Sequence, residues 1–173
     1  KAVARVLHAA SQGLGFIYIK GHGIPEAVIK SARANALEFF ALPEATKSAV
    51  KVSEKHRGWL GQGGAKMKDG AKADLKESFI WGHQDADGKT LEDHPLRGAN
   101  QWPDHLPTMQ AQAMAYFNHA HDVAHHLMRG FALGLDLEPD FFLKSASRPM
   151  SRASYVYYPA QPSDMGEGQF GVG

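Results

Sequence analysis

Histidines are concentrated in one segment, which reads HAHDVAHH over residues 119–126. Histidines four residues apart share one face of a helix and can chelate a metal ion there. His121 falls on the apolar stripe of its predicted helix, whereas His119, Asp122 and His126 point in other directions. No face therefore collects three ligands, and the pattern favours a polar, partly buried helix. Binding of zinc or nickel through His121 and His125 is the alternative.

Other catalytic patterns are missing from the sequence. There is no cysteine, which excludes disulfides, thiolate metal sites and cysteine nucleophiles. The glycines around residues 58–70 do not have the spacing of a phosphate-binding or dinucleotide-binding loop, and there is no Gly-x-Ser-x-Gly segment. His22, between two glycines, is expected to cap a backbone group in a tight turn.

Composition excludes several classes of partner. The 19 basic side chains nearly balance the 18 acidic ones, for a net charge of +1, so nothing favours nucleic acid or an anionic membrane as partner. No apolar run approaches the roughly 20 residues of a membrane span. The lack of cysteine suits a reducing cytoplasm. We expect a cytoplasmic protein that is a monomer or a weak homo-oligomer.

The periodicity of apolar residues predicts a mixture of helices and strands that must position any site. Helices are expected at 1–12, from Pro25 to about Leu42, at 43–52, at 108–135 with Gly134 as a stop signal, and at 138–143. Strands are expected at 16–19, 78–81 and 152–158. Residues 56–74 and 82–107 are expected to form irregular connections.

The order of several short motifs carries more information than any one of them. Together they resemble the isopenicillin N synthase-like family of iron(II)/2-oxoglutarate-dependent dioxygenases, and they span nearly the whole chain. The matching segments are GFIYI (15–19) with GHGIP (21–25), FFALP (39–43) with Lys47, RGW (57–59), DLKESF (74–79), NQWP (100–103), FALGL (131–135) through Phe141-Phe142, and YYP (157–159).

The resemblance implies an α+β fold, in which a helical N-terminal region packs on a double-stranded β-helix (jelly roll). Residues 1–150 would form the N-terminal region, with the first jelly-roll strand elements near 77–82. Residues 151–173 would begin the catalytic core. The chain would then be the N-terminal part of a longer protein.

The same resemblance implies the chemistry. In this family two histidines and a carboxylate hold Fe(2+), which leaves positions open for 2-oxoglutarate and O2. The ligands would lie after Gly173, so no catalytic residue and no metal ligand is assigned within this chain. The fragment alone is expected to be inactive, and its exposed sheet edge is expected to make it poorly stable.

The resemblance also suggests three residues for binding substrate or cosubstrate. Tyr158 would face the iron pocket and hydrogen-bond a carboxylate. Many plant members carry an asparagine two residues earlier, where this chain has Val156. Arg57 and Trp59, with His56 as an alternative, would lie at the pocket mouth, and an arginine there could pair with a substrate carboxylate.

The function implied is O2-dependent hydroxylation, desaturation or ring closure of a small molecule, coupled to decarboxylation of 2-oxoglutarate to succinate. One alternative is a binding or structural domain of the same fold with a degenerate metal site. The other is an unrelated protein that binds metal through its histidine helix.

Overall fold

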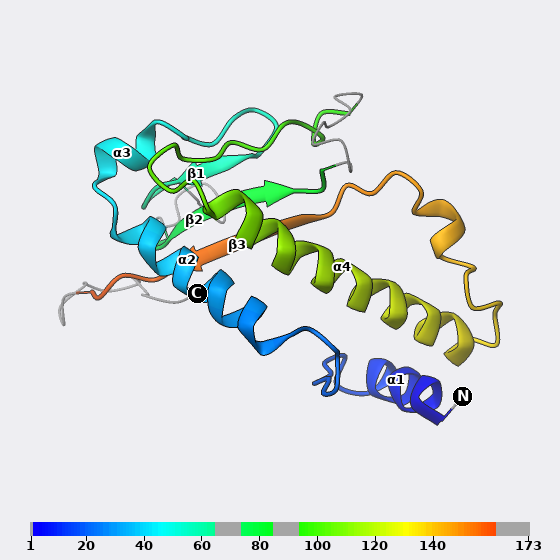
Figure 1. Cartoon of the computed structure of the whole chain (residues 1–173). Coiled ribbons are helices and arrows are strands. Elements are labelled where there is room, and N and C mark those ends of the chain that lie inside the picture. Colours follow the sequence, from blue (N-terminus) through cyan, green and yellow to red (C-terminus); the bar gives the residue numbers. More distant parts are fainter. Residues whose placement is uncertain (1, 65–73, 85–93, 162–173) are drawn as a thin grey trace. The chain divides into compact units, whose positions relative to one another are not determined.

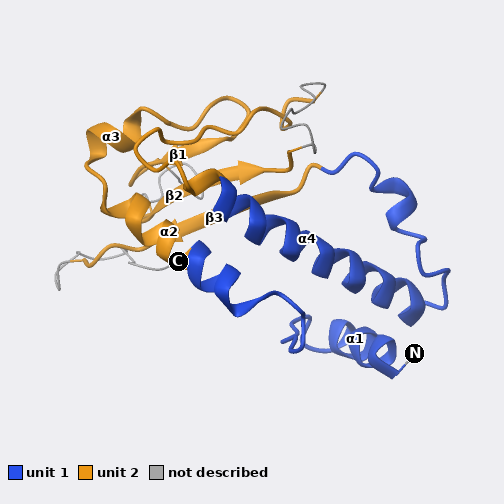
Figure 2. Cartoon of the chain, in the orientation of Figure 1, with its two compact units in different colours: residues 1–32, 111–149 blue, residues 33–110, 150–173 orange. Residues whose placement is uncertain are grey.

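The computed structural model describes residues 2–64, 74–84 and 94–161. Along the chain lie α1 (Ala2–Gln12), α2 (Glu26–Ala41), α3 (Glu44–Ser48), β1 (Gly58–Leu60), β2 (Glu77–Gly82), α4 (Met109–Gly134), a 3-10 turn (Leu143–Ser145) and β3 (Arg152–Tyr157) (Figure 1). The chain divides into two compact units, residues 1–32 with 111–149 and residues 33–110 with 150–173 (Figure 2).

In the first unit, α1 approaches α4 closely because two glycines lie one turn apart on α4. A Cβ atom at Gly130 would lie 2.7 Å from Leu7 Cδ1, and one at Gly134 would lie 2.9 Å from the carbonyl oxygen of Ala4. Ala4 and Leu7 are the buried residues of α1. The glycines therefore make room for α1, which explains why the most helix-breaking residues of α4 stand on this face.

The helix α4 ends at Gly134, as the sequence predicts, but the reversal occurs two residues later. Asp136 has a φ of +56°, and the amide of Leu137 donates to the carbonyl of Ala132 at 2.9 Å. This is the hydrogen bond of a Schellman motif, in which a left-handed residue closes a helix.

The helix α2 begins where the sequence places it. The amides of Val28 and Ile29 donate to the carbonyl of Pro25, as expected for a proline at the start of a helix. The helix stops at Ala41, just ahead of Leu42, because a residue before a proline disfavours the helical conformation.

The second unit contains an antiparallel sheet in the order β1-β2-β3. Phe79 of β2 is opposite Trp59 of β1 and Tyr155 of β3, so all three share one face. Phe39 of α2 packs on this face, with its ring centroid 4.7 Å from that of Phe79. We call this the covered face.

Aromatic side chains form the core over the covered face. Phe40 stacks on Tyr157 with ring centroids 5.2 Å apart. The ring centroids of Trp81 and Tyr155 are 4.4 Å apart. The ring centroid of Trp102 lies 6.4 Å from that of Trp81. Burial of these large rings stabilises the second unit.

The opposite side of β3 is exposed. Burial alternates strictly along the strand: Ala153, Tyr155 and Tyr157 are half-buried, whereas Arg152, Ser154 and Val156 are exposed. Tyr158, just after the strand, continues the alternation with 39% exposure. We call the side that carries Arg152, Ser154, Val156 and Tyr158 the open face.

Three expectations about elements are wrong. Residues 16–19 form no strand; Tyr18 is fully exposed, and a β-rich segment becomes a strand only where a partner strand accepts its hydrogen bonds. Residues 58–60, expected in a connection, form β1 because β2 offers them an edge. The helix predicted at 138–143 does not form; only its last residue, Leu143, is helical, as the start of a 3-10 turn at Leu143–Ser145.

The described residues show an α+β arrangement with a small sheet. Of the helices described, none combines the length and apolar character needed to cross a bilayer.

Candidate functional site

Tyr158 lies at the end of the open face, beside a lysine. The register that pairs Glu77 with Tyr157 brings Lys76 opposite Tyr158. Lys76 Nζ is 2.7 Å from Asp74 Oδ2. The pKa of Lys76 is raised, chiefly by its hydrogen bond to Asp74, and Tyr158 contributes to the rise. A phenol therefore stands beside an ammonium group that is paired with Asp74, and the phenol O–H is a donor suited to a carboxylate.

Lys76 was not anticipated as a site residue. It stands in the matched segment DLKESF, but its proximity to Tyr158 depends on the register between β2 and β3, which the sequence does not show. The polar residues Arg152 and Ser154, spaced two apart, are the sequence signal that could have identified the face on which Tyr158 lies.

Arg57 lies in the interior of the second unit, with 1% exposure, although the sequence suggested a pocket mouth. Its Nη1 group donates to the carbonyls of Lys55 (3.1 Å) and His56 (3.2 Å), and its Nη2 group donates to the carbonyl of Leu96 (3.2 Å). Its Nε–H has no hydrogen-bond partner. The guanidinium is held by backbone carbonyls, and contact with a substrate stays a prediction.

The backbone around Arg57 explains this burial. His56 and Gly58 have φ angles of +55° and +110°, which turn the chain sharply on both sides of Arg57. A Cβ atom at Gly58 would lie 2.3 Å from the carbonyl oxygen of Val50. Only glycine fits at position 58, and the turn that it permits directs Arg57 inward.

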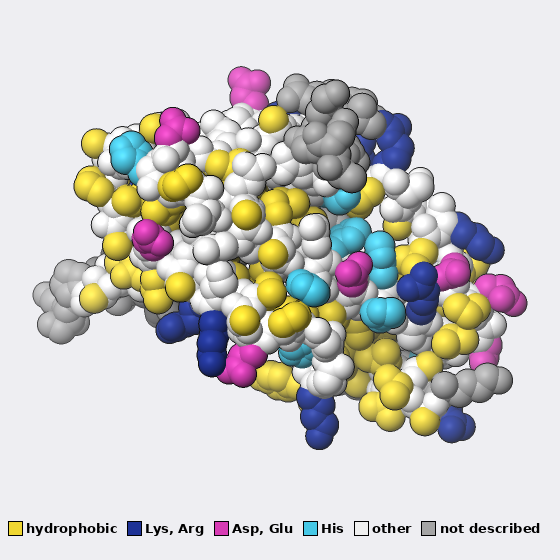
Figure 3. All heavy atoms as spheres, in the orientation of Figure 1, with side chains coloured by type: hydrophobic (Ala, Val, Ile, Leu, Met, Phe, Trp, Pro, Cys, Tyr) yellow, Lys and Arg dark blue, Asp and Glu magenta, His cyan; other side chains and the backbone are white. Residues whose placement is uncertain are grey.

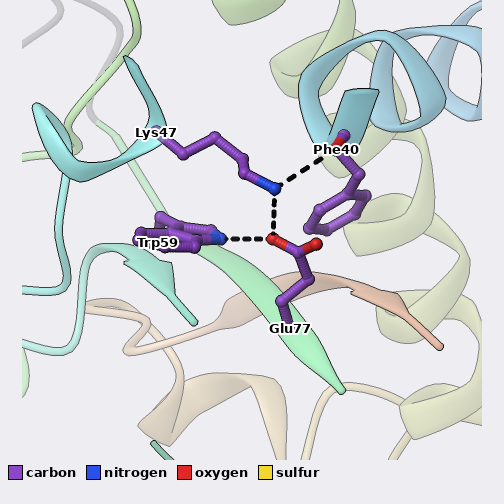
Figure 4. Close-up of polar contacts among 4 residues, drawn as sticks. All are labelled: Phe40, Lys47, Trp59 and Glu77. Carbon is purple, nitrogen blue, oxygen red and sulfur yellow. Dashed lines mark hydrogen bonds and ion pairs between the residues drawn. The ribbon is translucent and has the colours of Figure 1, made fainter. Parts of the chain in front are cut away.

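Trp59 points to the covered face, where it takes part in a buried polar cluster (Figure 4). Its Nε1–H donates to Glu77 Oε2 at 2.6 Å. The same oxygen is 2.7 Å from Lys47 Nζ, which also donates to the carbonyl of Phe40 at 3.2 Å. The ammonium lies 5.4 Å from the centre of the Trp59 ring. The role of Trp59 in substrate binding stays a prediction.

This cluster joins four elements. Phe40 belongs to α2, Lys47 to α3, Trp59 to β1 and Glu77 to β2. The side chains of Lys47 and Glu77 are only 8% and 7% exposed, so water cannot solvate their charges. The two charges pair with each other, and the Trp59 N–H and the Phe40 carbonyl supply further hydrogen bonds. The cluster fixes β1 against β2 and so supports the sheet on which Tyr158 lies.

Asn100 and Gln101 hold the segment 94–103 against the sheet. Asn100 accepts from the amide of Gly82 (2.8 Å) and donates to its carbonyl (2.9 Å), as a neighbouring strand would. Gln101 Nε2 donates to the carbonyls of Lys51 (2.9 Å) and Arg57 (2.6 Å). Through these hydrogen bonds, the motif NQWP ties its segment to the end of β2 and to the backbone at Lys51 and Arg57; we call this arrangement the clamp.

The histidines of α4 do not form a metal site of three ligands. The rings of His121 and His125 are 4.4 Å apart, and His121 stacks on Phe117 at 5.9 Å. Among the residues that the structure describes, no three His, Cys, Asp or Glu side chains could hold a metal ion. Histidine side chains are visible at the surface in Figure 3. His22 accepts from the amide of Ile24 at 3.1 Å and so caps its turn, as expected.

Comparison with known proteins identifies the family. The family described as non-haem dioxygenase in morphine synthesis N-terminal matches residues 1–105. A validamycin A dioxygenase from Streptomyces hygroscopicus subsp. limoneus is 30% identical over 99% of this chain and 49% of its own length. The chain thus spans about half the length of such curated relatives.

Solved structures agree. A 2OG-Fe(II) oxygenase family protein from Caulobacter crescentus superposes with a TM-score of 0.83 and 26% identity, over 94% of this chain and 53% of that chain. A full-length protein of Neurospora crassa, solved in complex with alpha-KG, superposes with a TM-score of 0.78 and 25% identity, over 96% of this chain and 52% of that chain. The chain belongs to the family of iron(II)/2-oxoglutarate-dependent dioxygenases and carries the region that this family has at its N-terminus.

Proposed function

We propose that the whole protein is an iron(II)- and 2-oxoglutarate-dependent dioxygenase that oxidises a small molecule by hydroxylation, desaturation or ring closure. Family membership supports the reaction class. The single structural observation that carries the proposal furthest is the open face of β3, where Tyr158 presents an exposed hydroxyl beside the Lys76–Asp74 ion pair.

The open face is proposed to form one wall of the active-site pocket within a jelly roll. Its side chains alternate with those of the covered face, so the aromatic core fixes the strand while leaving Tyr158 free to contact a ligand. The Tyr158 hydroxyl would donate to a carboxylate of 2-oxoglutarate or of the substrate, and the Lys76 ammonium, which is paired with Asp74, would stand beside it. Both groups would orient the ligand rather than move protons.

The iron ligands are proposed to lie outside the described residues, after Gly173. Bound iron(II) would supply the activation of O2, which is used to decarboxylate 2-oxoglutarate and to oxidise the substrate. The contribution of residues 2–161 would be to build the pocket wall, to bind carboxylates and to hold the sheet rigid. We further propose that the protein acts in the cytoplasm.

The test is release of succinate by the whole protein. With iron(II), 2-oxoglutarate and O2, a panel of small molecules should contain members that raise succinate formation above the background, and chelation of iron should abolish it. If iron binds but no compound raises succinate formation over a wide panel, 2-oxoglutarate is not the cosubstrate.

The second candidate is a catalytically degenerate binding domain of the same fold. It predicts that the whole protein binds no iron(II) above the level of nonspecific surface binding. Equilibrium dialysis of iron(II) under nitrogen separates the two, because the enzyme requires one tightly held ion and the degenerate domain requires none.

A further inference from the structure

Two arginines approach Gly82, at the end of β2 opposite to Lys76. Arg152 of β3 is the register partner of Gly82. A Cβ atom at Gly82 would lie 2.3 Å from Arg57 Nη2 and 2.8 Å from Arg57 Nε. That Cβ would point to the side of the sheet that carries Ser78, the side of Arg152. The guanidinium of Arg57 therefore occupies the place of the missing side chain, on the same side as Arg152.

No acidic side chain neutralises these two charges within the described residues. The partners of Arg57 are the backbone carbonyls of Lys55, His56 and Leu96, and its Nε–H has none. Arg152 is exposed. The pKa of Arg57 is lowered, first by burial and then by the positive charge of Arg152. A bound oxyanion would offset the repulsion between the two positive charges.

The two arginines differ in what they can contact. Arg57 is 1% exposed and is fixed by three carbonyls, so it acts as a constant positive charge beneath the surface. Arg152 is exposed, and its fork of N–H donors fits a carboxylate or phosphate in two parallel hydrogen bonds.

We propose that Arg152, with Arg57 behind it, binds an oxyanion of the substrate, so that the enzyme acts on small molecules that carry a carboxylate or a phosphate. This inference rests on the proposed function and names the substrate class for the same open face.

The position of Arg152 assigns this anion to the substrate rather than to 2-oxoglutarate. Arg152 and Tyr158 are six residues apart, which is about 20 Å of extended chain. A cosubstrate held at Tyr158 and Lys76 is too short to reach Arg152 as well. The two ends of the open face would therefore bind two different anions.

The test compares Arg152→Gln and Arg152→Lys with a control, Arg33→Gln, in the whole protein. Arg33 is an exposed arginine of α2, so its substitution removes the same charge elsewhere in the second unit. Binding is measured by thermal shift and calorimetry under nitrogen, with iron(II) and saturating 2-oxoglutarate. The probes are carboxylic acids with their primary amides, and phosphate monoesters with their parent alcohols, so that the two arms distinguish a carboxylate from a phosphate.

We expect at least one acid or phosphate ester to bind wild-type protein about tenfold more tightly than its neutral analogue. Arg152→Gln should remove that preference, Arg152→Lys should keep part of it, and Arg33→Gln should keep all of it. The inference is overturned if no anion of the panel binds, if neutral analogues bind equally well, or if Arg152→Gln binds the anion as wild type does.

The anion-binding test and the succinate assay can fail independently of each other. Succinate release without any effect of Arg152→Gln on anion binding would leave the proposed function intact and refute the anion site. Arg152-dependent anion binding by a protein that releases no succinate would refute the function and retain the site.

Discussion

Lys47 Nζ lies 2.7 Å from Glu77 Oε2 in a position where both side chains are more than nine-tenths buried. The same separation occurs on the surface of α2, where Lys30 and Glu26 are 74% and 78% exposed. The two pairs have the same chemistry and distance but differ in solvent access, which makes them a matched comparison.

Breaking the buried pair should be far more costly than breaking the exposed one. Lys47→Met should lower the free energy of unfolding of the whole protein by about 3–5 kcal/mol, because it leaves the Glu77 carboxylate buried without its counter-ion. Lys30→Met should change it by less than about 1 kcal/mol. Urea denaturation measures both.

The double variant Lys47→Met/Glu77→Gln checks the cause. It should recover much of the lost stability, because a neutral amide can still accept from Trp59 and no unpaired charge remains. If Lys47→Met costs no more than Lys30→Met, the cluster does not hold the sheet together.

The side chain of Asn100 should stabilise the fold through its NH2 group, which donates, as well as through its oxygen, which accepts. Asn100→Asp keeps an acceptor for the Gly82 amide but faces the Gly82 carbonyl with a second oxygen, so we expect a loss of about 1–3 kcal/mol in unfolding free energy. The control is Asn118→Asp, at an exposed position of α4, where the change should be within about 0.5 kcal/mol. Equal effects would refute the clamp.

The two glycines of α4 should respond differently to alanine. At Gly130 the new Cβ meets the flexible end of Leu7, whereas at Gly134 it meets the backbone carbonyl of Ala4. Gly130→Ala should be near neutral, because the gain in helix propensity of about 1 kcal/mol offsets a small shift of Leu7. Gly134→Ala should cost about 1–3 kcal/mol.

Thermal or urea unfolding shows which of the two variants has the lower free energy of unfolding. A Gly130→Ala variant that is less stable than Gly134→Ala would contradict the close approach of α1 to α4 at Ala4.

Local periodicity predicted the long helices α1, α2 and α4 well because their signals lie within one element. Pro25 and Pro43 frame α2, and the apolar stripe of α4 runs to Gly134. The strands β2 and β3 were found for a similar reason, since both are rich in β-formers. Residues 16–19 have the same composition, but strand formation there depends on a partner that no local pattern reveals.

The site was less predictable because it depends on tertiary register and backbone conformation. Tyr158 was selected from its motif, but the adjacent Lys76 requires the pairing of β2 with β3. Arg57 was expected at a pocket mouth, whereas the positive φ at Gly58 and the carbonyl of Leu96 hold it inside the second unit. The division into a region 1–150 and a jelly-roll core from 151 stays a prediction.

The most direct test of the open face as a ligand-binding wall compares two adjacent tyrosines. Tyr158 lies on the open face, whereas Tyr157 stacks on Phe40 on the covered face. The measurements are the dissociation constants of 2-oxoglutarate, and of a substrate found in the succinate assay, for the iron(II)-loaded whole protein under nitrogen. Tyr158→Phe should weaken one of these two bindings by about tenfold, the value of one charge-assisted hydrogen bond, and Tyr157→Phe should leave both unchanged. Unchanged binding in Tyr158→Phe, or an equal loss in both variants, would contradict the account.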